Sequence, residues 1–466
     1  MAAPASVGTY TRPLAEFALT VDATSVPDDV HHEVGRVVLD CLGCGVAGLV
    51  SPGGRIAVEL VKDEHGPLEG RLIGAGDASL MPAAFANTVL INALDYDVYG
   101  PEGHVPPIAV AVAMAVADAI DASGAELSSA ILAGLEVGGR VGAALRRAGM
   151  GGGRQLGKVR GHGHVVFAAA AAAGRLLHLT PDQMHHAFGI AGYSATVPTL
   201  RKFFDSPHVP MTKYDHLGLM SQNGIQAVLL AQRGFTGDLE VLEGDIGFWR
   251  FAGAEGCEWE TFTRDLGSHW LTDEISYKPY PAVLYTNPII EAALQLVREH
   301  ALQPEEIEHV EVRSARTMEN SPRKEIRHYL DAWLNSPYAI AAGLHDIKPR
   351  RTWLEPQNFT RLDLLAFQDR VSFAPLREGE VTTSGNYWER WAPVRVTIEA
   401  RGQRFEGGRD YLCTVDDHEL IEKFYGNVEG LMPRAEAEAM ERAAWTLSGL
   451  GSSRDLTRLF PVLKAD

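Results

Sequence analysis

Residues 165–179, VVFAAAAAAGRLLHL, contain six consecutive alanines between apolar flanks. Alanine has the highest helix propensity of all residues, and its small side chain lets neighbouring helices approach closely. The stretch therefore predicts a helix packed among other helices. A further helix is predicted to begin at Thr180, an N-cap residue followed directly by a proline. Apolar residues at helical spacing continue over most of residues 13–234, which are expected to form a compact all-helical body.

The pattern changes later in the chain, where EIEHVEVRSA and APVRVTIEARGQRFEGG alternate apolar and polar residues. Such alternation predicts β-strands. Helical stretches are expected between them, near residues 287–300 and 335–345. These observations predict a smaller α+β lid domain over residues 270–405. Residues 406–466 return to a helical pattern and are expected to pack back onto the first domain, residues 1–269. The predicted fold is mainly α, a large all-helical domain plus an α+β lid.

Composition limits the classes of function. The 466 residues are 46% hydrophobic and 22% charged, a balance typical of globular proteins, and the length suggests two or three domains. The formal charge, 42 − 60 = −18, disfavours binding to nucleic acid or anionic membranes unless basic groups are concentrated locally. The longest nearly apolar run, 105–117, falls short of the ~20 residues that span a bilayer, and no secretory signal is found at the N-terminus. We expect a cytoplasmic protein.

Four cysteines are present, and only Cys41 and Cys44 are close in sequence. Their spacing in CLGC would suit a redox or metal-binding pair. The surrounding residues, HHEVGRVVLDCLGCGVAGLV, instead show a helical and apolar pattern. Small core residues are therefore the favoured interpretation of both cysteines.

Four segments concentrate side chains that can act as acids, bases or anion-binding groups. They are DYDVYGPEGH with Asp95, Asp97, Tyr99 and His104; KVRGHGH with Lys158, Arg160, His162 and His164; TKYDH with Lys213 and His216; and YKPYP with Lys278 and Tyr280. Taken singly, each has a structural explanation. The aspartates could cap a helix and the lysines could be solvated. The paired histidines could be surface residues or metal ligands, although no third ligand is fixed by spacing.

Taken together and in order, these segments resemble the MmgE/PrpD family of 2-methylcitrate dehydratases, cis-aconitate decarboxylases and iminodisuccinate epimerases. NALDYDVYGPEGHVPP is similar to the family's H-x-x-D-F-D-D-T … H-P segment. TKYDHLGLMSQNGIQAVLLAQRGFTG is similar to T-K-x-x-H-x-G-x-A-A-x-N-G-x-x-A-x-L-L-A-x-x-G-F-T-G. YKPYPAVLYTNP resembles K-P-Y-P-x-x-x-Y-T-H. The resemblance extends over about residues 10–430.

The resemblance implies a homodimer that needs neither metal nor organic cofactor, with the active site between the helical domain and the lid. Substrates of this family are di- or tricarboxylates. Carried over by position, the resemblance assigns catalytic roles to Asp95, His104, His164, Lys213 and Lys278. It places Tyr99, Arg160, His162, His216 and Tyr280 in the substrate-binding part. Whether His162 or His164 is the site histidine stays open.

Three departures from the family pattern affect the site. Val98 replaces an aspartate, and Tyr99 stands at the position of a threonine. The loop that leads to His104 is shorter by one residue. Asn287 occupies the position of a common histidine. The bulkier Tyr99 is expected to reshape the floor of the substrate pocket.

The resemblance implies a cofactor-independent lyase that removes water or CO2 from a polycarboxylate. Such a reaction needs a base beside a carbon next to a carboxylate, and cations that stabilise the enolate charge. Histidine suits the acid–base task because its unperturbed pKa is ~6.5. An isomerase or epimerase would use the same groups, and an inactive homologue could bind an acid or serve as a structural subunit. The sequence alone does not separate these alternatives.

Overall fold

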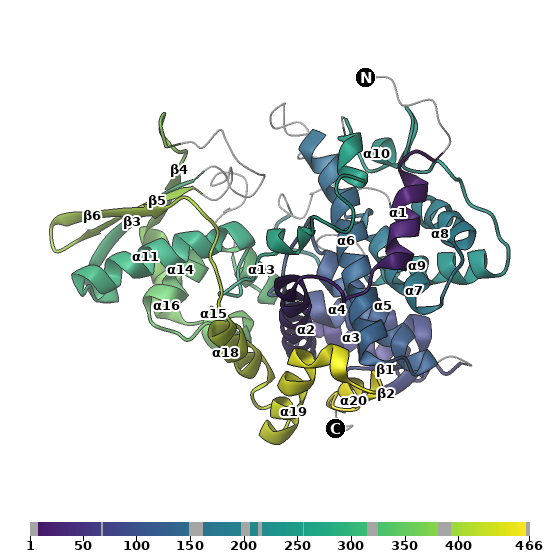
Figure 1. Ribbon diagram of the computed structural model, residues 1–466. Coiled ribbons are helices and arrows are strands. Elements are labelled where there is room, and N and C mark those ends of the chain that lie inside the picture. The colour runs from purple at the N-terminus through teal and green to yellow at the C-terminus, as the bar shows by residue number, and fades with distance from the viewer. Residues whose placement is uncertain are drawn as a thin grey trace.

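The computed structural model describes residues 8–66, 69–148, 162–196, 206–212, 217–254, 256–314, 325–380 and 393–462. The chain forms a large helical lobe and a smaller lobe that contains a sheet (Figure 1). This architecture confirms the predicted fold class, mainly α with an α+β part.

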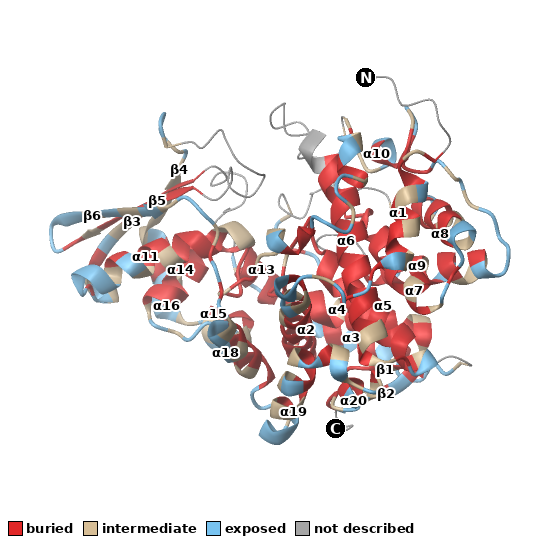
Figure 2. Cartoon of the chain, viewed as in Figure 1, coloured by how far each residue is buried: buried red, intermediate tan, exposed pale blue. Residues whose placement is uncertain are grey.

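The large lobe is built from helices of the N-terminal half. They are α1 (Thr11–Thr20), α2 (Asp28–Gly48), α3 (Pro52–Val61), α4 (Leu80–Asn92), α5 (Val105–Ile120), α6 (Gly124–Ala148), α7 (Val165–Leu176), α8 (Pro181–Tyr193), α9 (Leu217–Gln232) and α10 (Phe248–Phe251). Helix α7 packs against α5, α6, α8 and α9. Helix α7 therefore lies at the centre of the lobe. Both α7 and its neighbour α5 are buried along nearly their whole length (Figure 2).

The alanine run acts as the sequence predicted. Ala168 to Ala173 are completely buried in α7. A Cβ at Gly224 of α9 would lie 2.3 Å from the Cβ of Ala169, so the two helices touch through their backbones. At the next helix, the Thr180 side chain accepts a hydrogen bond from the Gln183 N–H in a capping box, which confirms the predicted start of α8.

A two-stranded antiparallel hairpin interrupts the helices of the large lobe, which was expected to be all-helical. Strands β1 (Glu69–Leu72) and β2 (Gly76–Ser79) pair beside α5. The chain turns between the strands at Gly74 and at Gly76, the first residue of β2, whose φ angles are +95° and +88°. Only glycine adopts such angles without strain. Strands of four residues carry too little alternation to be recognised in the sequence.

The smaller lobe combines a four-stranded sheet with helices. Its elements are α11 (Asn287–His300), β3 (Ile307–Ser314), α13 (Tyr329–Leu334), α14 (Ser336–Leu344), α15 (Pro356–Phe359), α16 (Leu362–Phe367), β4 (Val371–Ala374), β5 (Val394–Ala400) and β6 (Gln403–Arg409). The strand order is β4-β3-β5-β6, with β3 and β4 parallel and the other pairs antiparallel. Helix α11 packs on β5 and β6 and against α14. The predicted strands and the helices near 287–300 and 335–345 are therefore present.

Short 3-10 helices connect the larger elements. They occupy Trp259–Phe262, Leu271–Glu274, Leu284–Thr286, Pro304–Glu306, Arg351–Leu354, Gln368–Arg370 and Leu447–Gly449. The C-terminal tail is helical, with α18 (Asp417–Val428), α19 (Arg434–Trp445) and α20 (Arg454–Thr457). Helices α18 and α19 pack against α2 of the large lobe, and α18 lies between the two lobes (Figure 1). The domain limits at 269/270 and 405/406 remain predictions.

The cysteines and the apolar helices belong to the core. Cys41 and Cys44 are free and buried in α2, and burial raises the pKa of both thiols well above their usual range. Thiolate chemistry is therefore disfavoured at this pair. Among the described helices, none by itself has the length and apolarity of a membrane span, although α2 and α3, bent by 89°, reach those limits as a pair.

Candidate active site

The loop between α4 and α5 carries the first group of site residues. Helix α4 ends at Asn92, whose carbonyl accepts a hydrogen bond from the Asp95 N–H at 3.0 Å. This turn places Asp95 in the left-handed region, with φ +50°. Aspartate tolerates that conformation better than most residues, but it still stores some strain. The chain then turns back through Asp97 and reaches His104, which immediately precedes α5.

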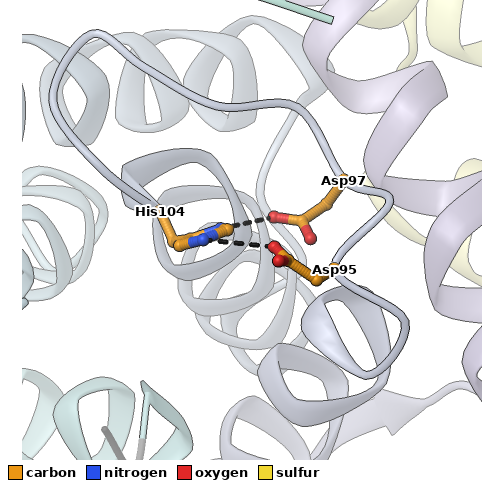
Figure 3. A group of neighbouring side chains, drawn as sticks. All are labelled: Asp95, Asp97 and His104. Atoms are coloured by element: carbon orange, nitrogen blue, oxygen red, sulfur yellow. Dashed lines mark hydrogen bonds and ion pairs between the residues drawn. The ribbon is translucent and has the colours of Figure 1, made fainter. Parts of the chain in front are cut away.

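The His104 ring faces both aspartates, which lie next to each other, as Figure 3 shows. Its Nδ1 is 2.9 Å from Oδ2 of Asp97, and its Nε2 is 3.3 Å from Oδ1 of Asp95. The Asn92 Nδ2 donates to Asp97 Oδ1 at 3.0 Å and lies 3.0 Å from His104 Nδ1. All three side chains are completely buried. With a proton on Nδ1 the ring donates to Asp97, while Nε2 lies at ion-pair distance from Asp95.

Lys278 brings a buried cation to the same cluster. Its Nζ donates to the Asp95 side chain at 2.8 Å and to the Asp95 carbonyl at 2.6 Å. Burial alone would lower the pKa of Lys278, but the charges of Asp95 and Asp97 and the hydrogen bond to Asp95 raise it above its usual value. The lysine therefore stays protonated next to the aspartates.

Backbone hydrogen bonds tie the Asp95 loop to the Lys278 segment. The N–H of Tyr99 donates to the Ser276 carbonyl at 2.9 Å, and the N–H of Ser276 donates back to Tyr99 at 2.7 Å. The next residue, Gly100, has φ +116°, and a Cβ there would lie 2.7 Å from the Glu274 carbonyl oxygen. Glycine is therefore required for this close approach. These hydrogen bonds hold together, at the site, two segments that are almost 180 residues apart in sequence.

The two candidate histidines have different surroundings. The ring of His162 lies edge-on to His104, with centroids 5.4 Å apart. The ring centroids of His164 and His162 are 6.0 Å apart, and the Nε2 of His164 donates to the Glu102 carbonyl at 2.9 Å. A carbonyl only accepts, so this nitrogen carries the proton. His162 is thus the nearer of the two to His104, while His164 holds the loop backbone. Tyr99 packs edge-on against His104, with the ring centroids 5.0 Å apart.

Tyr280 lies apart from this cluster, although it was expected to bind substrate. Its ring stacks on Trp353 and its hydroxyl donates to Glu291. The Asn287 side chain accepts from the Tyr280 N–H at 2.9 Å, so the residue at the family's histidine position shapes the Lys278 segment. The physical reason is that the chain bends at residues 279–282, directly after Lys278, so Tyr280 does not keep the side that two residues of a regular extended chain would share. Arg160, Lys213 and His216 lie outside the described residues.

Two residues of the cluster were not among the expected catalytic or binding residues. Asp97 binds His104 directly, and Asn92 orients both of them. The spacing of Asp95 and Asp97 in D-x-D was a visible signal, because a turn can direct two such carboxylates to one ring. Asn92 gave no signal, since its role depends on where α4 ends.

The cluster offers three chemical capacities. His104 can exchange a proton, Lys278 can stabilise an anion, and the aspartates can orient both groups. Asp95, Asp97 and His104 also bring possible metal-ligand atoms within 4.8 Å of one another. However, the Lys278 ammonium already binds Asp95, and a cation in the cluster would have to compete with it. The described geometry favours acid–base chemistry.

Fold and cluster together define a class of protein: a two-lobed, mainly helical chain with a buried acid–base group where the Lys278 segment meets the large lobe. The family follows from comparison with known proteins. Residues 12–258 match the MmgE/PrpD N-terminal domain, and residues 280–448 match the MmgE/PrpD C-terminal domain. The chain belongs to the MmgE/PrpD family, as its motifs predicted.

Several cis-aconitate decarboxylases are similar to the chain. The human protein is 30% identical over 293 residues, which cover 59% of this chain and 58% of the human protein. The mouse protein is 25% identical over 454 residues, 93% of this chain and 89% of its own length. A protein of Aspergillus terreus is 28% identical over 305 residues, 62% and 60% of the two chains. The matches to the human and fungal proteins thus span less than two thirds of those relatives.

Proposed function

We propose that the chain is a lyase that acts on a small di- or tricarboxylate and that its first candidate reaction is the decarboxylation of cis-aconitate. The observation that carries this proposal is His104, buried between Asp97 and Asp95 with Lys278 beside it. Similarity to cis-aconitate decarboxylases supports the choice of substrate. Dehydration of a hydroxy-tricarboxylate is the second reaction that the same groups can perform.

In the decarboxylation, one bond between carbon and a carboxylate breaks and CO2 leaves. The electron pair stays on the carbon framework, where a neighbouring carboxylate holds it as an enolate. A proton from His104 then forms the new C–H bond. A tricarboxylate and one proton thus become a dicarboxylate and CO2. In a dehydration, the imidazole instead removes a proton next to a carboxylate and then gives a proton to the leaving hydroxyl group, which departs as water.

Lys278 is assigned to stabilise the anion. Two of its three N–H donors bind Asp95, and the third is assigned to a substrate carboxylate. A buried ammonium acts strongly on a developing negative charge because little water screens it. We include Lys213 and Arg160 in the same anion-binding role on the basis of their sequence positions. A homodimer that needs no cofactor and works in the cytoplasm is part of this proposal.

The experiment incubates the purified protein with cis-aconitate, 2-methylcitrate or iminodisuccinate in D2O and follows the products by NMR. Loss of CO2 with one deuteron gained indicates decarboxylation, and loss of water indicates dehydration. Deuterium uptake without loss of either indicates an epimerase. The matched control is Asp95→Asn, purified identically, which should lose the activity and so excludes a contaminating enzyme. A folded wild-type protein that converts none of the three substrates would reject the proposal for these substrates.

A further inference from the structure

A lysine of the C-terminal tail reaches the site loop. Lys423 lies in α18, and its Nζ is 2.6 Å from Oδ1 of Asp40 in α2. The same Nζ donates to the Tyr96 carbonyl at 2.7 Å. Lys423 is 7% exposed and Asp40 2%, so the pair is nearly excluded from water. Tyr96 stands between Asp95 and Asp97, which makes this contact part of the site's support.

Asp40 holds the other side of the same loop. Its second oxygen, Oδ2, accepts a hydrogen bond from the Val98 N–H at 2.7 Å. The residues immediately before and after Asp97 are therefore fixed by one ion pair, one through its carbonyl and one through its N–H. Asp97 is the residue that binds Nδ1 of His104. A shift of this loop would change the position of the carboxylate against the imidazole.

Tyr96 also connects Lys423 to the segment that carries Lys278. The Lys423 ammonium lies over its ring, 4.1 Å from the centroid. The Tyr96 hydroxyl donates to the Pro279 carbonyl at 2.9 Å. Pro279 directly follows Lys278, so one side chain connects the tail, the Asp95 loop and the Lys278 segment. These contacts form a continuous path from α18 to both halves of the site.

We propose that Lys423 and Asp40 are positioning residues of the reaction, which hold Asp95 and Asp97 in place against His104 and Lys278. This inference rests on the proposed function for its kinetic consequences. The pair's hydrogen bonds to the loop go to its backbone, and neither of these two bonds involves Asp95, Asp97, His104 or Lys278. Neither residue was indicated by the sequence motifs.

Stability alone does not account for such a pair. Removing two charges from water is costly, and replacing a buried ion pair by neutral groups of similar size is often neutral or stabilising. Burial raises the pKa of Asp40, and the charge of Lys423 opposes that rise. The carboxylate form that receives the Val98 N–H therefore depends on the lysine. Holding the loop of Asp95 and Asp97 in one conformation is the functional gain that offsets the free energy of removing the two charges from water.

The test is a double variant, Asp40→Asn with Lys423→Met, which removes both charges and leaves no unpaired buried ion. The asparagine oxygen can still accept from Val98, so the variant should fold and melt within a few degrees of the wild type. We expect kcat to fall by about 10- to 100-fold, the scale of a misplacement of reacting groups by about 1 Å. KM should change by less than about threefold. The pH profile of kcat should shift, which a smaller folded fraction alone would not cause.

The matched control is Asp118→Asn. Asp118 is also a buried carboxylate that holds the C-terminal tail, through the hydroxyls of Ser453 and Thr457. It stands at the far end of α5 from His104 and contacts no part of the site loop among these bonds. Its variant should lose some stability and keep the wild-type kcat and pH profile. An equal loss of kcat in this control would overturn the positioning role.

A readout without substrate separates this inference from the proposed function. In protein labelled with 15N-histidine, the His104 ring signals report its bond to Asp97. The chemical shifts of these signals should change in the double variant and remain unchanged in Asp118→Asn, even if no tested acid is turned over. If the double variant does not fold, Lys423→Met alone is used, because Asp40, whose pKa burial raises, can then take up a proton and leave no buried charge. The same direction of change is expected. Wild-type His104 signals in the folded variant would overturn the inference.

Discussion

His104 is the residue on which the proposed chemistry depends most directly. Both of its ring nitrogens face carboxylates, so no neighbouring side chain can take over its place in the cluster. We expect His104→Ala to lower kcat/KM by about 100-fold or more, the usual effect of losing a general acid or base. The control is His309→Ala, since His309 lies on β3 of the small lobe and bonds Ser372. Initial rates and melting curves of both variants check the prediction, and normal turnover by His104→Ala would refute it.

The second histidine of the site can be identified by comparing two variants. The family resemblance left His162 and His164 open, and the structure places the His162 ring beside His104. We expect His162→Ala to reduce the rate by about 100-fold or more and His164→Ala to have a smaller effect. His164→Ala should chiefly reduce stability, because its bond to the Glu102 carbonyl is lost. Small and equal effects on the rate would exclude both from catalysis.

At the scale of elements, the helices were predictable where local pattern and packing agree. The alanine run of α7 and the Thr180 cap gave correct helices because propensity, capping and burial favour the same conformation. The strands β3 and β5 were predictable because many of their residues are buried, and β6 because every second residue is half-buried from Phe405 onward. The β1–β2 hairpin escaped prediction, since four-residue strands depend on glycine turns and on packing against α5.

The site was predictable only in part, because it is assembled from distant segments. Asp95, His104 and Lys278 were selected by their motifs, and the structure brings them together. Asn92 and Lys423 could not be found in this way. Their roles depend on where α4 ends and on how α18 packs against α2, and no local spacing encodes either.

Helix α6 provides a test of how the element next to the site responds to pH. Burial raises the pKa of Glu136 to about 7, against the partial compensation of Arg140 and the Leu271 N–H. The folded state therefore keeps a proton that the unfolded chain releases above about pH 4.5. Linkage then makes the protein less stable as pH rises from about 4.5 to 7, by roughly 3 kcal/mol from this group.

We expect Glu136→Gln to remove this dependence. Its stability relative to the wild type should increase between pH 5 and pH 8, because the glutamine has no proton to lose. Urea denaturation at both pH values measures the difference. Glu16→Gln is the control, since Glu16 lies on α1 in an exposed pair with Arg12. A constant difference between Glu136→Gln and the wild type at the two pH values would show that Glu136 keeps an ordinary pKa.

At the scale of the whole molecule, the site and the surface differ in charge. The chain carries a formal charge of −18, which would repel a polycarboxylate from most of its exterior. Among the described residues, Lys278 places a buried cation beside the histidines of the site. Binding therefore has to come from local cations rather than from long-range attraction, and added salt should weaken substrate binding only slightly.

The activity is expected to be independent of metal. Asp95, Asp97 and His104 could ligate a cation, but the Lys278 ammonium already lies 2.8 Å from Asp95 and compensates charge there. We expect activity to survive dialysis against a chelator without a change in rate, since lysine and histidine supply the anion stabilisation and the proton. Added Zn2+ should inhibit, because it would compete with Lys278 for Asp95 and with the proton on His104. Activity that disappears on dialysis and returns with Zn2+ would instead make the three residues metal ligands and replace the proposed mechanism.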